Sequence, residues 1–124
     1  MQLGHFSISL AVKDIERSRD FYTKLGFELV GGNAEQHWLI LQNGDSTIGL
    51  FQGMFESNIL TFNPGRDSRS NVIAGFTDIR DIQRHLKTQG IELTSETDET
   101  AMGPASFTLT DPDGNAILVD QHVE

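Results

Sequence analysis

Three ionisable side chains near the two ends of the sequence are the best candidates for chemistry. His5, Asp120 and His122 lie in segments whose alternating residues predict β-strands, and strand parity places Asp120 and His122 on one face. If the first and last strands pair, these imidazole and carboxylate groups would meet at one rim and could hold a divalent metal ion. The alternative is that they are polar residues on solvent-exposed strand ends.

Few other residues offer catalytic chemistry. The chain has no cysteine, so it has no disulfide, no thiolate nucleophile and no thiolate metal site. Its histidines follow no metal-binding spacing and form no triad with serine and aspartate. If the protein catalyses a reaction, Asp120 is the candidate general base, because a carboxylate near an apolar floor can have its pKa raised toward working pH.

Composition limits the class of protein. The chain has 124 residues, 37% of them hydrophobic and 22% charged, which is typical of a single globular domain. A net charge of −9 with no basic stripe disfavours nucleic-acid binding and leaves open a cationic ligand. No apolar run approaches the ~20 residues of a membrane span, and the N-terminus lacks the basic region of a signal peptide. We therefore expect a cytoplasmic protein without a membrane or nucleic-acid partner.

The elements that must position these residues repeat along the chain. Asp14-Ile15 aligns with Asp78-Ile79 without a gap, and Gly26 then falls over Gly90. The periodicity predicts two copies of a βαβββ unit, with a helix that begins at an aspartate and stops at a glycine in each copy. The predicted strands are 5–12, 27–30, 37–42 and 47–51, then 72–76, 91–94, 106–110 and 116–120, and the predicted helices begin at Asp14 and Asp78 and stop at Gly26 and Gly90.

These elements predict an α+β fold in one domain, 1–124. Module one covers about 5–53, a linker covers 54–70, and module two covers about 71–122. Hairpin turns are predicted at Asn43-Gly44 and at 111–114, where proline presets one dihedral angle and glycine accepts a positive one. Because one helix covers one face of a four-stranded sheet, the other face needs a partner, and a second module is the natural one.

Two stretches resemble one known family. SISLAVKDIERSRDFYTKLGFEL, from Ser7, and DPDGNAILVD, from Asp111, are similar to the vicinal oxygen chelate superfamily, which includes glyoxalase I, bleomycin-resistance proteins and extradiol dioxygenases. The resemblance runs from about His5 to His122. It implies two βαβββ modules whose sheets form an open cup, often in a homodimer. In most enzymes of the family, a divalent metal on the cup floor grips adjacent substrate oxygens.

The resemblance also locates the positions of the family's four metal ligands. They fall on Ser7, Gly49, Asn71 and Leu118. Catalytic Zn²⁺ or Ni²⁺ prefers imidazole and carboxylate groups. Two of these four residues are weak neutral donors, and the side chains of the other two donate nothing. We therefore expect neither the usual metal nor another cofactor.

A small-molecule site is expected on the cup floor instead. Aromatic side chains in a concave apolar pocket commonly hold small organic ligands. Trp38, the only tryptophan, is either a core residue or a stacking platform for a flat or cationic ligand. The predicted lining residues are Ser7, Trp38, Gly49, Phe51, Asn71, Leu118 and Asp120.

Three functions follow, in order of preference. The first is a glyoxalase-like, metal-free protein that binds a small, partly apolar molecule and sequesters it or performs mild chemistry. The second is a bleomycin-resistance-like protein that sequesters a bulky cationic drug in a dimeric, acidic cleft. The third is a divalent-metal lyase or dioxygenase with displaced ligands, for which His5, Asp120 and His122 are the available residues.

Overall fold

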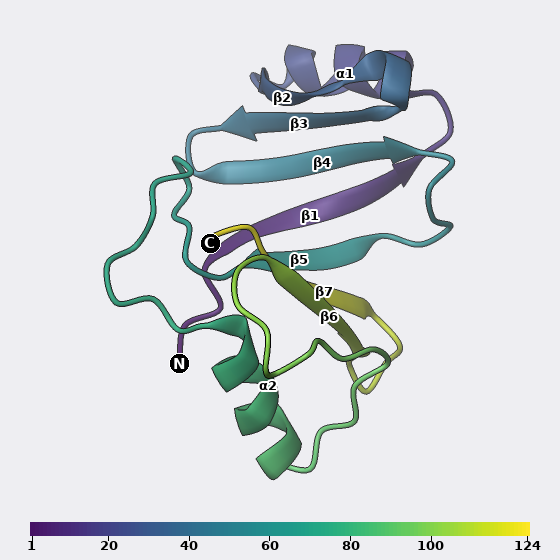
Figure 1. Cartoon of the computed structure of the whole chain (residues 1–124). Helices are drawn as coiled ribbons and strands as arrows, with labels where there is room; N and C mark the ends of the chain where they lie inside the picture. The colour runs from purple at the N-terminus through teal and green to yellow at the C-terminus, as the bar shows by residue number, and fades with distance from the viewer. The chain divides into compact units, whose positions relative to one another are not determined.

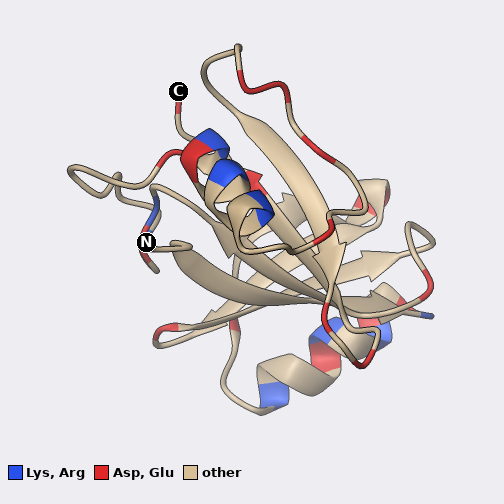
Figure 2. Cartoon of the chain, turned by 90° about the horizontal axis from the view of Figure 1, so that it is seen from below, with Lys and Arg blue, Asp and Glu red and all other residues tan.

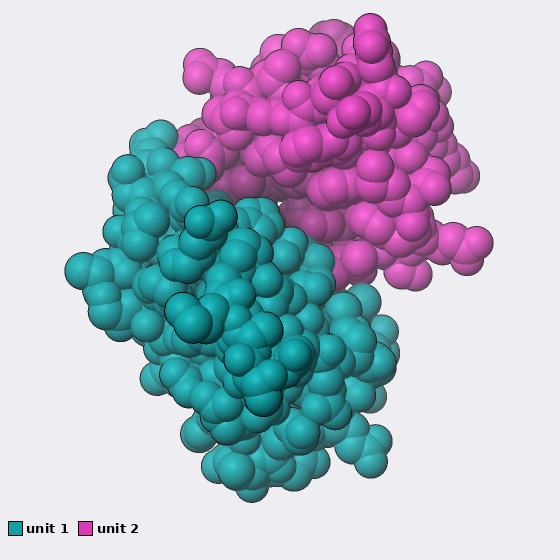
Figure 3. Space-filling model, viewed as in Figure 1, with its two compact units in different colours: residues 1–6, 60–124 teal, residues 7–59 magenta.

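The computed structural model describes residues 1–124 and contains two α-helices and seven β-strands (Figure 1). It divides into two compact units (Figure 3): unit 1 is 1–6 with 60–124, and unit 2 is 7–59. The α+β class is confirmed. The elements are β1 (His5–Val12), α1 (Ile15–Lys24), β2 (Glu28–Asn33), a short 3-10 helix (Ala34–Gln36), β3 (Trp38–Asn43), β4 (Ser46–Gln52), β5 (Ile59–Asn63), α2 (Ile79–Thr88), β6 (Ala105–Thr110) and β7 (Ala116–Gln121).

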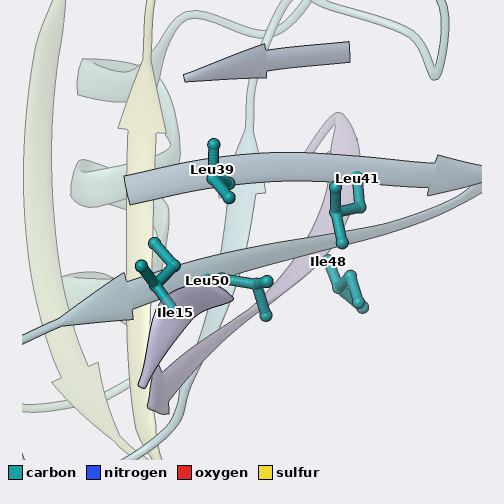
Figure 4. Packing of buried hydrophobic residues seen from close by; sticks show 5 residues of the cluster. All are labelled: Ile15, Leu39, Leu41, Ile48 and Leu50. Atoms are coloured by element: carbon teal, nitrogen blue, oxygen red, sulfur yellow. The ribbon is translucent and has the colours of Figure 1, made fainter. Parts of the chain in front are cut away.

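Unit 2 is a sheet in the order β2-β3-β4-β1 with α1 packed on one face. β2, β3 and β4 are antiparallel neighbours, whereas β1 runs parallel to β4. Alternate residues of β3 and β4 point toward the helix, where Leu39, Leu41, Ile48 and Leu50 pack with Ile15 of α1 to form the core (Figure 4). The residues between them point to the opposite face, which therefore carries the candidate site.

Unit 1 has fewer strands than unit 2 and longer loops. Its strands follow the order β5-β7-β6, and β6 and β7 form an antiparallel hairpin. α2 packs over one face of this hairpin, and Ile79 and Ile82 of the helix are fully buried against Phe107 of β6. The predicted turn at 111–114 is confirmed, because the Gly114 N–H donates to the Asp111 carbonyl at 3.0 Å.

Both helices begin and end as the sequence predicts. The carboxylates of Asp14 and Asp78 accept hydrogen bonds from backbone N–H groups of the first turn, at 3.2 and 2.9 Å. Past the last turns, Gly26 and Gly90 have φ of +100° and +80°, which a residue with a Cβ adopts only with strain. These local signals fixed the helix boundaries within one or two residues.

A second cap, which the sequence reading missed, repeats in both halves. The first N–H of α1, on Ile15, donates to Gln52 Oε1 at 2.8 Å, and the first N–H of α2, on Ile79, donates to Gln121 Oε1 at the same distance. Each glutamine closes the last strand of its half. The repeat in the sequence therefore has a structural counterpart, in which one side chain ties each helix to its strand.

Two predicted strands of the second half are wrong. The segment 72–76 forms only an isolated bridge from Val72 to Arg66, since Gly75 has φ of +69° and interrupts the extended backbone. The segment 91–94 is also no strand, although Thr94 N–H reaches the Thr108 carbonyl at 2.8 Å. Instead, β5 lies within the predicted linker 54–70. The division into two βαβββ modules stays a prediction.

The two helices carry most of the basic residues of the chain. Figure 2 shows Lys and Arg gathered on the two helices, and six of the nine lie there: three in α1 and three in α2. Neither helix is long and apolar enough to cross a membrane.

Candidate functional site

The face of the unit 2 sheet that points away from α1 brings together four of the predicted site residues. The register places Trp38 opposite Phe51 and Ile40 opposite Gly49, so these residues of β3 and β4 share one face. On β1, Ser9 lies beside Gly49, and Ser7 has the same parity. The sequence-based prediction that Gly49 and Phe51 point the same way is confirmed.

Three aromatic rings form a continuous surface on this face, which we call the aromatic ledge: Trp38, Phe51 and Phe55. The rings of Trp38 and Phe51 are nearly parallel, at 10°, with centroids 6.5 Å apart. Phe55 then contacts Phe51 at a tilt of 44° and 5.3 Å. All three side chains are half-buried and lie outside the hydrophobic core. Trp38 therefore lies outside the core of unit 2, and its role as a stacking platform stays a prediction.

Gly49 makes room for the ledge. A Cβ placed on Gly49 would lie only 2.6 Å from Cε2 of Phe51 and 3.4 Å from Cδ1 of Ile40. The Phe51 ring therefore lies over the bare backbone of β4. Gly49 does not have a positive φ, so the absence of a side chain here serves this close approach.

Polar groups border the aromatic ledge. Gln42 Nε2 donates to Thr47 Oγ1 at 2.9 Å on the same face, and Ser9 and Thr47 are only 8% and 9% exposed. The Trp38 indole N–H reaches Gln36 Oε1 at 3.5 Å. The face thus combines flat apolar area with neutral hydrogen-bonding groups, an arrangement common in small-molecule sites.

Sequence reasoning missed Phe55, because it lies in the predicted linker. The signal for it was an aromatic residue four positions after Phe51, within the segment GMFES. It also missed the pair of Gln42 and Thr47, which only the hairpin register brings side by side.

The other three predicted site residues belong to unit 1. Asn71 is not on a strand: its backbone N–H donates to Asp67 Oδ1 at 2.9 Å within a turn. Leu118 lies opposite Thr108 and Asp120 opposite Ser106, both on the face away from buried Val119. Their predicted place in one site with the aromatic ledge stays a prediction.

Asp120 is paired with His122. Its Oδ2 lies 3.0 Å from Nε2 of His122, and Nδ1 of the same ring lies 3.5 Å from the Asn63 amide. The hydrogen bond to Asp120 raises the pKa of His122, and the negative charge of Asp120 adds to the effect against partial burial and the positive charge of Arg66. Asp120 is therefore half of an acid–base pair, and not the lone carboxylate on an apolar floor that was expected.

The residues at the family's four ligand positions do not fit a divalent metal. Ser7 and Asn71 are weak donors, Leu118 donates nothing, and the space beside Gly49 is filled by the ring of Phe51. The displaced set also finds no support, since no three His, Asp or Glu side chains of this chain gather as a metal site requires. Asp120 and His122 meet, but His5 is associated with Asp67.

The comparison with protein families agrees with the fold. The Glyoxalase/Bleomycin resistance protein/Dioxygenase superfamily matches residues 2–119. The chain belongs to this superfamily. A curated relative, the glyoxalase domain-containing protein RDO1 of Mycosarcoma maydis, is 34% identical over 114 residues, which are 88% of this chain and 62% of the relative. The chain thus spans less than two thirds of that protein.

Solved structures show the same fold at low identity. A superfamily member from Vibrio splendidus 12B01 has a TM-score of 0.64 at 18% identity and covers 94% of this chain and 97% of its own. A protein described as an NAD-dependent benzaldehyde dehydrogenase from Legionella pneumophila has a TM-score of 0.68 at 14% identity, with 96% and 99% covered. The expected superfamily fold is therefore confirmed.

Proposed function

We propose that this superfamily member binds a small, flat, partly apolar organic molecule on the aromatic ledge of unit 2, without a metal ion. The observation that carries the proposal is the Phe51 ring, which lies over Gly49 and against Trp38 where relatives place a metal ligand. A flat ligand that extends this stack gains apolar burial and ring contacts at once.

The bordering polar groups give such a ligand an orientation. Gln42 and Thr47 are neutral and already paired, so a ligand that meets them must offer hydrogen-bonding atoms of its own. Without the metal, selection rests on shape and neutral hydrogen bonds rather than on two adjacent oxygens. Sequestration of such a molecule needs only the aromatic ledge.

The single tryptophan makes the test direct. Trp38 is part of the ledge, so its fluorescence reports a ligand that stacks there. We expect 2-naphthol to change the Trp38 emission saturably in protein treated with chelator, and Phe51→Ala to weaken this binding about tenfold or more. Ile91→Ala, which removes a half-exposed apolar side chain of unit 1, is the control. Unsaturable emission, or equal affinity in Phe51→Ala, would end the proposal.

A cationic ligand is the second candidate, and the charges of unit 2 favour it. All four basic residues of this unit lie in the segment 13–24, while the segment 25–59 carries only acidic ones: Glu28, Glu35, Asp45 and Glu56. A cation stacked on Trp38 would gain from both the ring and this negative field. N-methylquinolinium should then bind more tightly than 2-naphthol, and its affinity should fall as salt rises. Equal, salt-independent affinities would favour the neutral ligand.

A further inference from the structure

Two ionisable side chains at the end of β7 share one face of the strand. The side chains of Val119, Gln121 and Val123 are buried. Asp120 and His122 alternate with them and therefore point to the opposite face. The side chain of His122 is 60% exposed and that of Asp120 is 37% exposed. Both groups are thus open to a small molecule that meets this face of unit 1.

The imidazole ring of His122 is held from both sides. Its Nε2 lies 3.0 Å from Asp120 Oδ2, and because a carboxylate oxygen accepts, this nitrogen carries the hydrogen. On the other side, Asn63 Oδ1 accepts from the backbone N–H of His122 at 3.3 Å, which turns the amide nitrogen of Asn63 toward Nδ1 at 3.5 Å. The two partners together select the tautomer in which Nδ1 has the free lone pair.

Nδ1 is the nitrogen of this ring that can take up a proton. Its hydrogen bond with Asn63, at 3.5 Å, is long and lies in an exposed position, so a ligand can replace it. Asp120 on the opposite nitrogen stabilises the charged ring that then forms, and it raises the pKa of His122. A general base is most effective when its pKa lies near the working pH, and this shift moves a histidine in that direction.

A positive charge lies close to this base. The charge of Arg66 acts on His122, since it lowers the pKa of His122 against the larger effect of Asp120. The guanidinium is held in place, because Nη1 of Arg66 donates to the carbonyl of Ser70 at 2.7 Å. Removal of a proton from carbon leaves a negative charge on the substrate, and a fixed cation near the base stabilises that charge.

We propose that His122 is the general base of a site in unit 1 that removes a proton from a weakly acidic C–H group of a small organic molecule, with Asp120 as the residue that positions its ring. Asp120 was the base expected from the sequence. In the structure its Oδ2 accepts from the ring of His122, and the free lone pair lies on Nδ1. Binding on the aromatic ledge needs neither residue, so the two sites are tested separately.

5-Nitrobenzisoxazole is a suitable probe, because a single base converts it into a coloured product. The base takes the proton of its one acidic C–H bond, the electron pair of that bond completes a nitrile, and the N–O bond breaks to leave 2-cyano-4-nitrophenolate. The proton goes to Nδ1 of His122 and then to solvent. No oxidant, metal ion or second substrate takes part, so the assay is run on protein treated with chelator.

Replacement of the base is the first test. The wild-type chain should catalyse this elimination, and His122→Gln should lower kcat/KM about tenfold or more. His85→Gln is the matched control, because it removes an exposed histidine of the same unit, on α2, and should leave kcat/KM unchanged. An equal kcat/KM in wild type and His122→Gln, or an equal loss in His85→Gln, would overturn the proposal.

The pH dependence tests the positioning by Asp120. As pH rises, kcat/KM of the wild-type chain should increase with the midpoint of His122, above the ordinary pKa of about 6.5. Asp120→Asn removes the charge that stabilises the protonated ring, so this midpoint should shift to lower pH. A purely structural role of Asp120 would lower the rate without that shift, and an unchanged midpoint would remove Asp120 from the site. Thermal unfolding verifies that all three variants fold.

Discussion

Replacement of Gly49 by alanine tests whether the ring of Phe51 depends on the bare backbone beneath it. The new Cβ would lie 2.6 Å from Phe51 Cε2, closer than real side chains approach, so the ring must move. Phe51 is held between Trp38 and Phe55, and moving it weakens two aromatic contacts of about 0.5–1.5 kcal/mol each. We expect a loss of about 1–3 kcal/mol, or roughly 4 °C in melting temperature per kcal/mol.

A double-mutant cycle with Phe51→Ala isolates this effect. In the Phe51→Ala background the clash is gone, and Gly49→Ala should be neutral or stabilising by up to about 1 kcal/mol, since alanine orders the unfolded strand. Gly31 provides the control, because it lies opposite the same Ile40, lacks a positive φ, and has room for a Cβ at 3.7 Å. The readouts are urea unfolding and Trp38 fluorescence. An equal cost of Gly49→Ala in both backgrounds would refute the reasoning.

Two further predictions concern side chains whose hydrogen-bond partners the structure shows. Gln121→Met keeps the side-chain volume but leaves the buried N–H of Ile79 without its acceptor. It should lower the free energy of unfolding, measured in urea, by about 1–3 kcal/mol, and Gln52→Met at the partly buried counterpart should lower it clearly less. Equal losses in the two variants would contradict this. The hydrogen bond to Asp120 raises the pKa of His122 in the folded chain. The pair therefore stabilises the fold fully below the pKa of about 6.5 that His122 has in the unfolded chain, and this contribution is lost as pH rises through the pKa of His122 in the folded chain. The difference in stability between wild type and Asp120→Asn should therefore be larger at pH ~5.5 than at pH ~8.5; a difference that grows with pH would contradict it.

The sequence predicted those elements whose signals are local. Asp14 and Asp78 predict helix starts because a short carboxylate side chain accepts hydrogen bonds from the exposed N–H groups of the first turn. These hydrogen bonds are local in the sequence and do not depend on the rest of the fold. Alternation likewise located β1, in which alternate residues pack against the core under α1. On these elements the sequence-based prediction and the structure agree closely.

The failures come from contacts that are distant in sequence. The repeat alignment favoured a strand at 72–76, but Gly75 takes a positive φ and Ile73 donates to Gly65 instead of a strand neighbour. β5 lay unrecognised before the turn Asn63-Pro64-Gly65, although its apolar run and that turn were a usable strand signal. The caps from Gln52 and Gln121 span 37 and 42 residues, beyond the reach of any local rule.

The candidate site shows the same limit. Gly49 and Phe51 shared a predicted face because parity within one strand is a local property. The stack with Trp38 depends on the register between β3 and β4, and the distance from Phe51 to Gly49 depends on a rotamer, so neither follows from the sequence. The resemblance indicates that the residues at the family's four ligand positions are poor ligands, but it does not indicate that a ring occupies the space beside one of them.

The ring over Gly49 also limits what kind of site this sheet can form. A divalent ion needs several charged or imidazole ligands at fixed distances, and the side chains at the four positions that the resemblance gives offer neither. The ring of Phe51 lies over the bare backbone at one of these positions, which covers that part of the sheet and creates flat apolar area. A glutamate placed at position 49 would therefore not create a metal site, since its side chain collides with Phe51 first; the chemistry open to this face is set by the ring as much as by the residue types at the four positions.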